Sequence, residues 1–201
     1  MRTSPIAGLG QIVTPMSVYQ SCHFMLPIDP QTIDTARVGR MGELVVELEL
    51  LARGWLVGNF NATTANSAGW DLFATRGSRT VRIRVKAKRP GVSSFVWSLK
   101  KDGSIFPQLD AAADDDFVAA VSFEASGHPM VYVLPASRVQ DDLLADHRAW
   151  LSGTKRDGGA RKETSAVRAH MDQVTGKPGH GFESRWAGFR GRWDALSRPE
   201  V

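Results

Sequence analysis

The stretch GWDLFATRGSRTVRIRVKAK, residues 69–88, decides the fold of this chain. Residues 70–75 predict a strand, and Gly77 and Ser78 predict a turn into a second strand over residues 80–88. From Val81 to Lys88 apolar and basic side chains alternate without exception, which is the pattern of a strand that buries one face. The stretch therefore predicts two paired strands, the second of which carries a row of basic side chains on one face.

A helix is predicted upstream over residues 32–53, with Thr32 or Asp34 as its N-cap and Gly54 as its stop. Its apolar residues keep a helical spacing. They are Ile33, Met41, Leu44, Val45, Leu48, Leu51 and Ala52, with Val46 and Leu50 widening the apolar face. Glu43 lies roughly 140° from this stripe at 100° per residue, which places it away from the predicted core. A further strand is predicted over residues 55–60.

Downstream, strands are predicted over residues 95–99, 117–123 and 130–134, and a helix over residues 137–151. Residues 152–181 are rich in Gly, Lys and Arg and predict a mobile basic insert without regular structure. A last helix over residues 182–196 would carry Trp186, Phe189 and Trp193 on one face. This order predicts an α/β fold with a central mixed β-sheet flanked by helices. Residues 1–31 are expected to form an irregular arm, and residues 32–201 a single domain.

The composition is that of a globular protein: 42% of the 201 residues are hydrophobic, 23% are charged and the net charge is +4. The single cysteine, Cys22, excludes an internal disulfide framework and a cysteine-rich zinc site, and favours a cytoplasmic location. No apolar run is long enough for a membrane span, so no membrane partner is expected. The five histidines show no metal-ligand spacing, and each is interpreted as a surface or turn residue.

Three positions on these elements form a pattern: Glu43 on the helix, Asp71 on one strand and Lys86 on the next. The pattern resembles the PD-(D/E)XK nuclease superfamily, especially its resolvase-like and restriction-endonuclease-like branches. In that family a helix with an early Glu precedes the sheet, an Asp follows on the second strand, and an acidic residue or Gln stands two places before a Lys on the third. The likeness extends over most of residues 32–197 and implies a restriction-endonuclease-like fold.

The resemblance implies a protein that acts on DNA or RNA by metal-dependent phosphodiester hydrolysis. Asp71 would be the principal ligand of Mg²⁺ or Mn²⁺, Glu43 an auxiliary ligand, and the main-chain carbonyl of Val85 a third. Lys86 would face the phosphate and help to activate the attacking water. Asp71, Lys86 and Glu43 are therefore the catalytic candidates. A divalent cation suits this reaction because it neutralises the phosphate and lowers the pKa of bound water.

Arg84 departs from the family pattern, because it stands where an acidic residue or Gln is expected. A guanidinium does not ligate Mg²⁺ and repels the ion at short range, but it binds phosphate well. Strand alternation places Arg82, Arg84, Lys86 and Lys88 on one face, so Arg82, Arg84 and Lys88 are candidates for nucleic-acid binding. Either a helical carboxylate, Glu43 or Glu47, replaces the missing ligand, or hydrolysis is lost and a phosphate-binding face remains.

Three functions therefore stay open at this point. The first is a Mg²⁺-dependent nuclease, and the second is a catalytically degenerate, nuclease-derived module that binds nucleic acid without cutting it. The third is a protein-interaction role inside a larger assembly, which the basic segment over residues 152–181 would serve. The resemblance also leaves room for a homodimer or a protein partner, since many members of the family dimerise.

Overall fold

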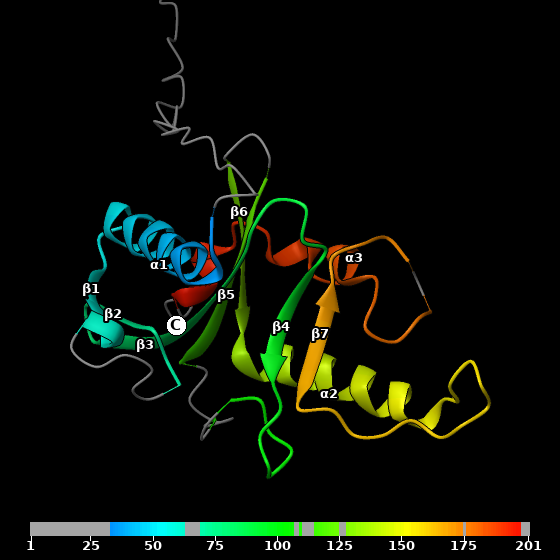
Figure 1. Cartoon of the computed structure of the whole chain (residues 1–201). Helices are drawn as coiled ribbons and strands as arrows, with labels where there is room; N and C mark the ends of the chain where they lie inside the picture. Colours follow the sequence, from blue (N-terminus) through cyan, green and yellow to red (C-terminus); the bar gives the residue numbers. More distant parts are fainter. Residues whose placement is uncertain are drawn as a thin grey trace, which may run out of the picture.

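The computed structural model describes residues 33–62, 69–106, 109, 115–124, 128–174 and 176–197. The irregular arm predicted over residues 1–31 lies outside them. Among the described residues the fold is α/β, with a five-stranded mixed sheet between helices, as predicted (Figure 1). No helix in the described ranges is both long and apolar enough to cross a membrane.

The central sheet has the strand order β1-β2-β3-β5-β6. Neighbouring strands are antiparallel except β3 and β5, which are parallel. The bounds of these strands are β1 Leu56–Asn59, β2 Leu72–Arg76, β3 Arg79–Lys88, β5 Asp116–Phe123 and β6 Pro129–Pro135. Strand β3 is therefore central, and its register places Arg84 beside Val118 of β5.

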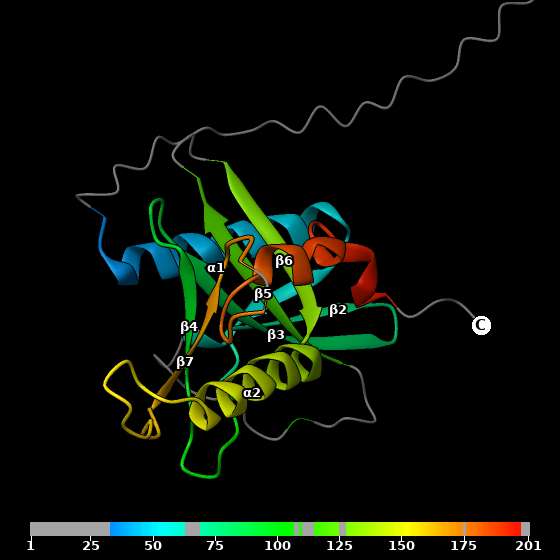
Figure 2. The ribbon, with the colours of Figure 1, turned by 90° about the vertical axis from the view of Figure 1, so that its right-hand side faces the viewer.

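Alternation along β3 divides the interior into two cores. Val81, Ile83 and Val85 are buried on the face that helix α1 (Thr35–Ala52) covers. The opposite face is covered by helix α2 (Ala136–Ser152) and by a two-stranded antiparallel sheet, β4 (Ser94–Ser98) and β7 (Ala166–His170) (Figure 2). The basic residues of β3 share this second face, as the alternation predicted.

Helix α1 begins at the predicted N-cap, because the Asp34 side chain accepts a hydrogen bond from the Arg37 N–H at 2.8 Å. Its buried side, however, is not the predicted stripe. The buried positions are Val38, Gly42, Val46 and Leu50, whereas Leu44, Leu48 and Leu51 are 42%, 66% and 49% exposed. The prediction for these three leucines is wrong, because their spacing alone could not show which side of a broadly apolar helix meets the sheet.

The contact between α1 and β3 depends on the absence of a side chain at Gly42. A Cβ atom built there would lie 2.6 Å from Cβ of Ala87, well inside contact distance. Glycine lets helix and strand backbones approach closely at this point. This approach sets the rotation of α1, and it brings the next residue, Glu43, down toward the sheet.

Residues 152–181 contain regular structure where an irregular insert was predicted. Strand β7 lies inside this segment and pairs along its whole length with β4, from Ser94 opposite His170 to Ser98 opposite Ala166. Val167 and Ala169 of β7 are buried in the core that includes Trp97. The short strand was missed because its two apolar residues stand among many polar ones, and its partner lies about seventy residues earlier in the chain.

The predicted helix over residues 182–196 is also wrong in form. The chain makes three short turns instead: α3 (Phe182–Arg185) and the 3₁₀ turns η2 (Ala187–Phe189) and η3 (Trp193–Leu196). Gly191 adopts a positive φ of 64°, which interrupts any continuous helix. As a result Trp186 packs in the α2-side core and Trp193 in the α1-side core, so the two tryptophans do not form one stripe.

Candidate functional site

Asp71 lies immediately before β2 and is 5% exposed. Its backbone continues the pairing with β3, since its N–H donates to the Ile83 carbonyl at 3.0 Å. Its Oδ2 accepts from the Val85 N–H at 2.6 Å. Its Oδ1 accepts from Arg84 Nη1 at 3.1 Å and from Asn61 Nδ2 at 3.0 Å. Three donors thus fix this carboxylate at the end of the strand.

Glu43 reaches the same place from α1. Its carboxylate accepts hydrogen bonds from Arg40 Nη1 at 2.9 Å, Asn59 Nδ2 at 3.3 Å and Asn61 Nδ2 at 3.1 Å. Asn61 therefore holds Glu43 and Asp71 through a single amide nitrogen. The Glu43 side chain is 14% exposed and faces the sheet. The prediction that it points away from the core is wrong, because the helix turns a different side to the sheet than its leucines suggested.

Strand β3 contributes two cations beside these carboxylates. The Arg84 side chain is 25% exposed and forms an ion pair with Asp71. Lys86 lies two residues further along the same face, and no hydrogen bond or ion pair holds its ammonium among the described residues. We refer to Glu43, Asn61, Asp71, Arg84 and Lys86 as the Asp71 cluster.

Burial dominates the electrostatics of this cluster. Burial raises the pKa of Asp71 even though the Arg84 charge and the Val85 N–H act in the opposite direction. Burial, and then the Arg84 charge, lower the pKa of Lys86, against the attraction of Asp71. Perturbed titration of a carboxylate and a neighbouring amine is typical of catalytic sites, although structural ion pairs also produce it.

The donor set fits a hard divalent cation. Mg²⁺ and Mn²⁺ prefer oxygen ligands and are commonly held by one or two carboxylates, and here two carboxylates converge on one amide group. Arg84 competes for this position, because its guanidinium occupies the Oδ1 side of Asp71. The Val85 N–H lies at the cluster; its carbonyl as a metal ligand stays a prediction.

Comparison with known proteins adds a structural likeness. No family model matches this chain, and no curated protein matches it either. Among solved structures, the bacterial homing endonuclease I-Ssp6803I is similar over 81% of this chain and 91% of its own length, with 18% sequence identity and a TM-score of 0.45.

The other basic residues of β3 have partners within the protein. Arg82 donates through Nε and Nη2 to the two carboxylate oxygens of Asp116, at 2.7 and 2.8 Å, and lies over the Trp70 ring at 5.0 Å. Lys88 lies 5.9 Å from the Phe95 ring centre, and burial lowers its pKa. The basic side chains share one face of β3, as predicted, but Arg82 and Lys88 already contact an acidic or aromatic side chain of the protein. Nucleic-acid binding by Arg82, Arg84 and Lys88 stays a prediction.

Two site residues were missed in the sequence. Asn59 is the last residue of strand β1, and Asn61 lies in the 3₁₀ turn η1 (Phe60–Ala62) that follows it. The Asn61 N–H donates to the Asn59 side chain at 2.8 Å, which makes a tight local turn and aims both amides at Glu43. The sequence signal for these two site residues is a pair of asparagines at the end of a predicted strand, the second of them ten residues before the candidate ligand Asp71.

Proposed function

We propose that this protein acts on nucleic acid and hydrolyses phosphodiester bonds with the help of a divalent cation bound at the Asp71 cluster. The observation that carries the proposal is the shared amide: Asn61 contacts Glu43 at 3.1 Å and Asp71 at 3.0 Å, so two carboxylates that are 28 positions apart in the chain converge on one nitrogen. The helix and two strands that supply Glu43, Asp71 and Lys86 follow one another in the order that the PD-(D/E)XK resemblance implies.

Each residue of the cluster has a distinct part in this proposal. Asp71 and Glu43 would hold the cation through carboxylate oxygens, and Asn61 would keep the two carboxylates aligned. A bound Mg²⁺ or Mn²⁺ supplies charge neutralisation at the phosphate and a more acidic attacking water. Lys86 has no internal partner among the described residues, so its ammonium is available for the phosphate or the water.

Arg84 would have two roles in this proposal. In the structure its guanidinium pairs with Asp71 at 3.1 Å. A cation held by Asp71 would compete with this ion pair, because the two positive charges repel one another. A guanidinium at this position can form a bidentate contact with a phosphate oxygen pair. Arg84 would thus supply a phosphate-binding group where the family has an acidic ligand.

The test is cleavage of plasmid or branched DNA with Mg²⁺ or Mn²⁺. We expect Asp71→Ala to reduce cleavage to background and Lys86→Ala to reduce it by about 10²-fold or more, the typical contribution of a proton-transfer group. Glu43→Gln should reduce it strongly, whereas Glu47→Gln, one turn along the same helix, should cut like the parent protein. Undiminished cleavage by Asp71→Ala would refute the assignment.

A second function is favoured by one observation, the Arg84–Asp71 ion pair itself. If the guanidinium permanently takes the place of the cation, the protein binds nucleic acid without cutting it. Affinity for a short duplex would then fall steeply with salt, and Arg84→Ala would weaken it for every sequence. Salt-dependent binding without cleavage in any metal would select this function, and absence of binding at low salt would exclude both.

A further inference from the structure

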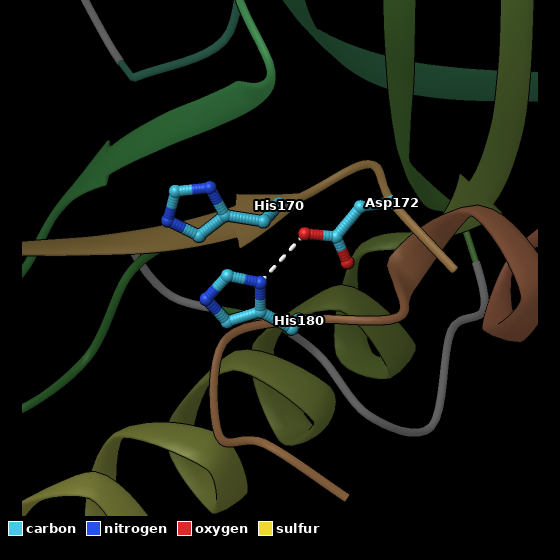
Figure 3. Close-up of side chains that lie close together, drawn as sticks. All are labelled: His170, Asp172 and His180. Carbon is cyan, nitrogen blue, oxygen red and sulfur yellow. Dashed lines mark hydrogen bonds and ion pairs between the residues drawn. The ribbon is translucent and has the colours of Figure 1, made fainter. Parts of the chain in front are cut away.

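A second polar cluster lies far from the Asp71 cluster in the chain, at the end of β7 and in the segment that follows it. His170 ends the strand, and Asp172 and His180 come from the next ten residues (Figure 3). One ligand atom from each of the three side chains lies within 4.8 Å of those of the other two. We refer to His170, Asp172 and His180 as the histidine cluster.

The backbone around the histidine cluster is closed by hydrogen bonds. The His170 N–H donates to the Gly179 carbonyl at 2.8 Å, and the Met171 N–H donates to the Ser93 carbonyl at 2.7 Å. Residues 171–179 therefore form a loop whose two ends meet at His170. This closure, and not proximity in sequence, brings His180 against the end of the strand.

The carboxylate of the cluster is held in place before any ligand arrives. Asp172 Oδ1 accepts from the Gly181 N–H at 2.9 Å and from the Val174 N–H at 3.3 Å. Its Oδ2 lies 2.6 Å from Nδ1 of His180. Figure 3 shows this carboxylate at the edge of the His180 ring. Its orientation is thus fixed by two backbone donors and one imidazole.

The two imidazoles face one another. Their ring centres are 4.4 Å apart and their planes differ by 7°. Parallel rings direct their lone pairs side by side, so one ring must turn about its Cβ–Cγ bond for both to reach one ion. His170 is the ring that is free to do so, because the contact of its Nδ1 is a long one, 3.5 Å to the Ser93 hydroxyl.

We propose that His170, Asp172 and His180 form a binding site for a divalent transition-metal ion such as Zn²⁺. Two imidazole nitrogens and one carboxylate oxygen are a donor set that zinc accepts, whereas Mg²⁺ prefers oxygen donors alone. Binding of the ion would release to solvent the proton that His180 Nδ1 shares with Asp172 Oδ2, so that both atoms can act as ligands. Three protein ligands leave a fourth position of a tetrahedral ion open.

A pocket lies beside the histidine cluster. His170 and His180 line a pocket of about 470 Å³ between α2 and β7, whose wall also contains Trp150, Arg168 and Lys177. An ion held by the cluster would link β7 to the segment that carries Asp172 and His180, beside this pocket. Because the ion binds the folded chain, it should also raise the melting temperature.

The experiment is a titration of the full chain with Co²⁺ and Zn²⁺, in the presence of excess Mg²⁺ to occupy the Asp71 cluster. We expect one equivalent to bind, seen by calorimetry and by the absorption of nitrogen-ligated Co²⁺. His170→Ala and His180→Ala should weaken binding by more than the roughly 10- to 100-fold that loss of an outer-shell partner costs. His128→Ala, which removes a histidine near the opposite core, should bind like the parent protein.

Two further measurements keep the result interpretable. Circular dichroism shows whether each variant is folded, and Zn²⁺ should raise the melting temperature of the parent protein but not of folded His170→Ala. If His180→Ala fails to fold, His170→Ala alone tests the proposal. This variant should fold, since the His170 side chain makes no short hydrogen bond in the free protein. No stoichiometric Co²⁺ or Zn²⁺ binding, or equal binding by His170→Ala, would overturn the proposal and leave Asp172 and His180 as a hydrogen-bonded pair that closes the loop.

Discussion

The Asp71 cluster and the histidine cluster lie on different parts of the fold and present different donor atoms. The first is formed by residues of α1 and β3 together with Asn61 and Asp71, and it offers two carboxylates, of which Asp71 pairs with Arg84 and Glu43 with Arg40. The second stands on β7 and a closed loop and offers two imidazoles with one carboxylate. Oxygen donors favour hard ions and nitrogen donors favour zinc-like ions. The two proposed cation sites are therefore chemically distinct, and each can be tested while the other is intact.

The largest effect is expected from removing the Arg84 guanidinium, the positive charge that competes with a metal ion for Asp71. At 4 Å and an effective dielectric constant of 20, two unit charges interact by about 4 kcal/mol. Arg84→Gln should therefore raise Mn²⁺ affinity at this cluster on the order of 1,000-fold, as measured by calorimetry, and leave Zn²⁺ binding at the histidine cluster unchanged.

Arg82→Gln is the matched control for this experiment. It removes an arginine from the same face of β3, but that arginine pairs with Asp116 and not with Asp71. We expect its effect on Mn²⁺ affinity to be small. An affinity that is unchanged or lower in Arg84→Gln would show that the arginine does not compete with a cation at Asp71.

A smaller effect is expected from Asp142, which supports the half of the molecule that carries the histidine cluster. Its carboxylate accepts hydrogen bonds from Trp186 Nε1 at 2.9 Å and Arg138 Nε at 2.9 Å, and it forms an ion pair with Arg185 at 3.0 Å. Asp142→Asn should lower the free energy of unfolding by about 1.5–3 kcal/mol, the range for hydrogen bonds to a charged group. The neighbouring, exposed Asp141→Asn should change it by less than about 0.5 kcal/mol.

The unfolding free energy that is lost in Asp142→Asn should become smaller as the pH falls. Burial opposes its ionisation, but the hydrogen bonds from Trp186 and Arg138 and the charges of Arg185 and Arg138 together outweigh burial and lower the pKa of Asp142 below its ordinary value of 3.8. A lowered pKa in the folded state stabilises the protein above that ordinary value, and this stabilisation disappears as the pH falls through the folded-state pKa. Urea unfolding of the parent protein and of Asp142→Asn should show that their difference in unfolding free energy is smaller at acidic pH than at neutral pH. The same difference at both pH values would contradict this.

The smallest effect is expected at the helix–strand contact that delivers Glu43. Gly42→Ala places a methyl group 2.6 Å from Cβ of Ala87, so α1 must move outward. We expect a loss of about 1 kcal/mol in unfolding free energy, because overpacking outweighs the better helix propensity of alanine. Cleavage should fall with it, since Glu43 moves away from Asp71, while Zn²⁺ binding should not change.

Gly39→Ala is the control that separates the effect of close packing at Gly42 on stability from the effect of helix propensity. No atom lies within 4 Å of a Cβ built at Gly39 on the same helix, so this variant should be as stable as the parent protein or more stable. If Gly42→Ala and Gly39→Ala change stability and cleavage alike, close packing at Gly42 does not position Glu43.

The local patterns of the sequence were sufficient for the central strands and for the first helix. Strict alternation predicted which residues of β3 are buried, and the Asp34 cap marked the start of α1. Asp71 directly precedes β2 and Lys86 lies on β3, the two strands that the predicted short turn joins, and their joint role at a site stays a prediction. These features depend on interactions between residues that are close in the chain, which is why pattern and spacing express them.

Only the tertiary structure decided the orientation of Glu43, the existence of β7 and the meeting of His170 with His180. The rotation of α1 depends on how closely Gly42 approaches Ala87, and the helical spacing of leucines carries no information on that distance. Strand β7 exists because β4 pairs with it from far along the chain, and its own short pattern is too weak to indicate it. The sequence by itself determined which groups are available for chemistry; long-range packing determined which of them lie together.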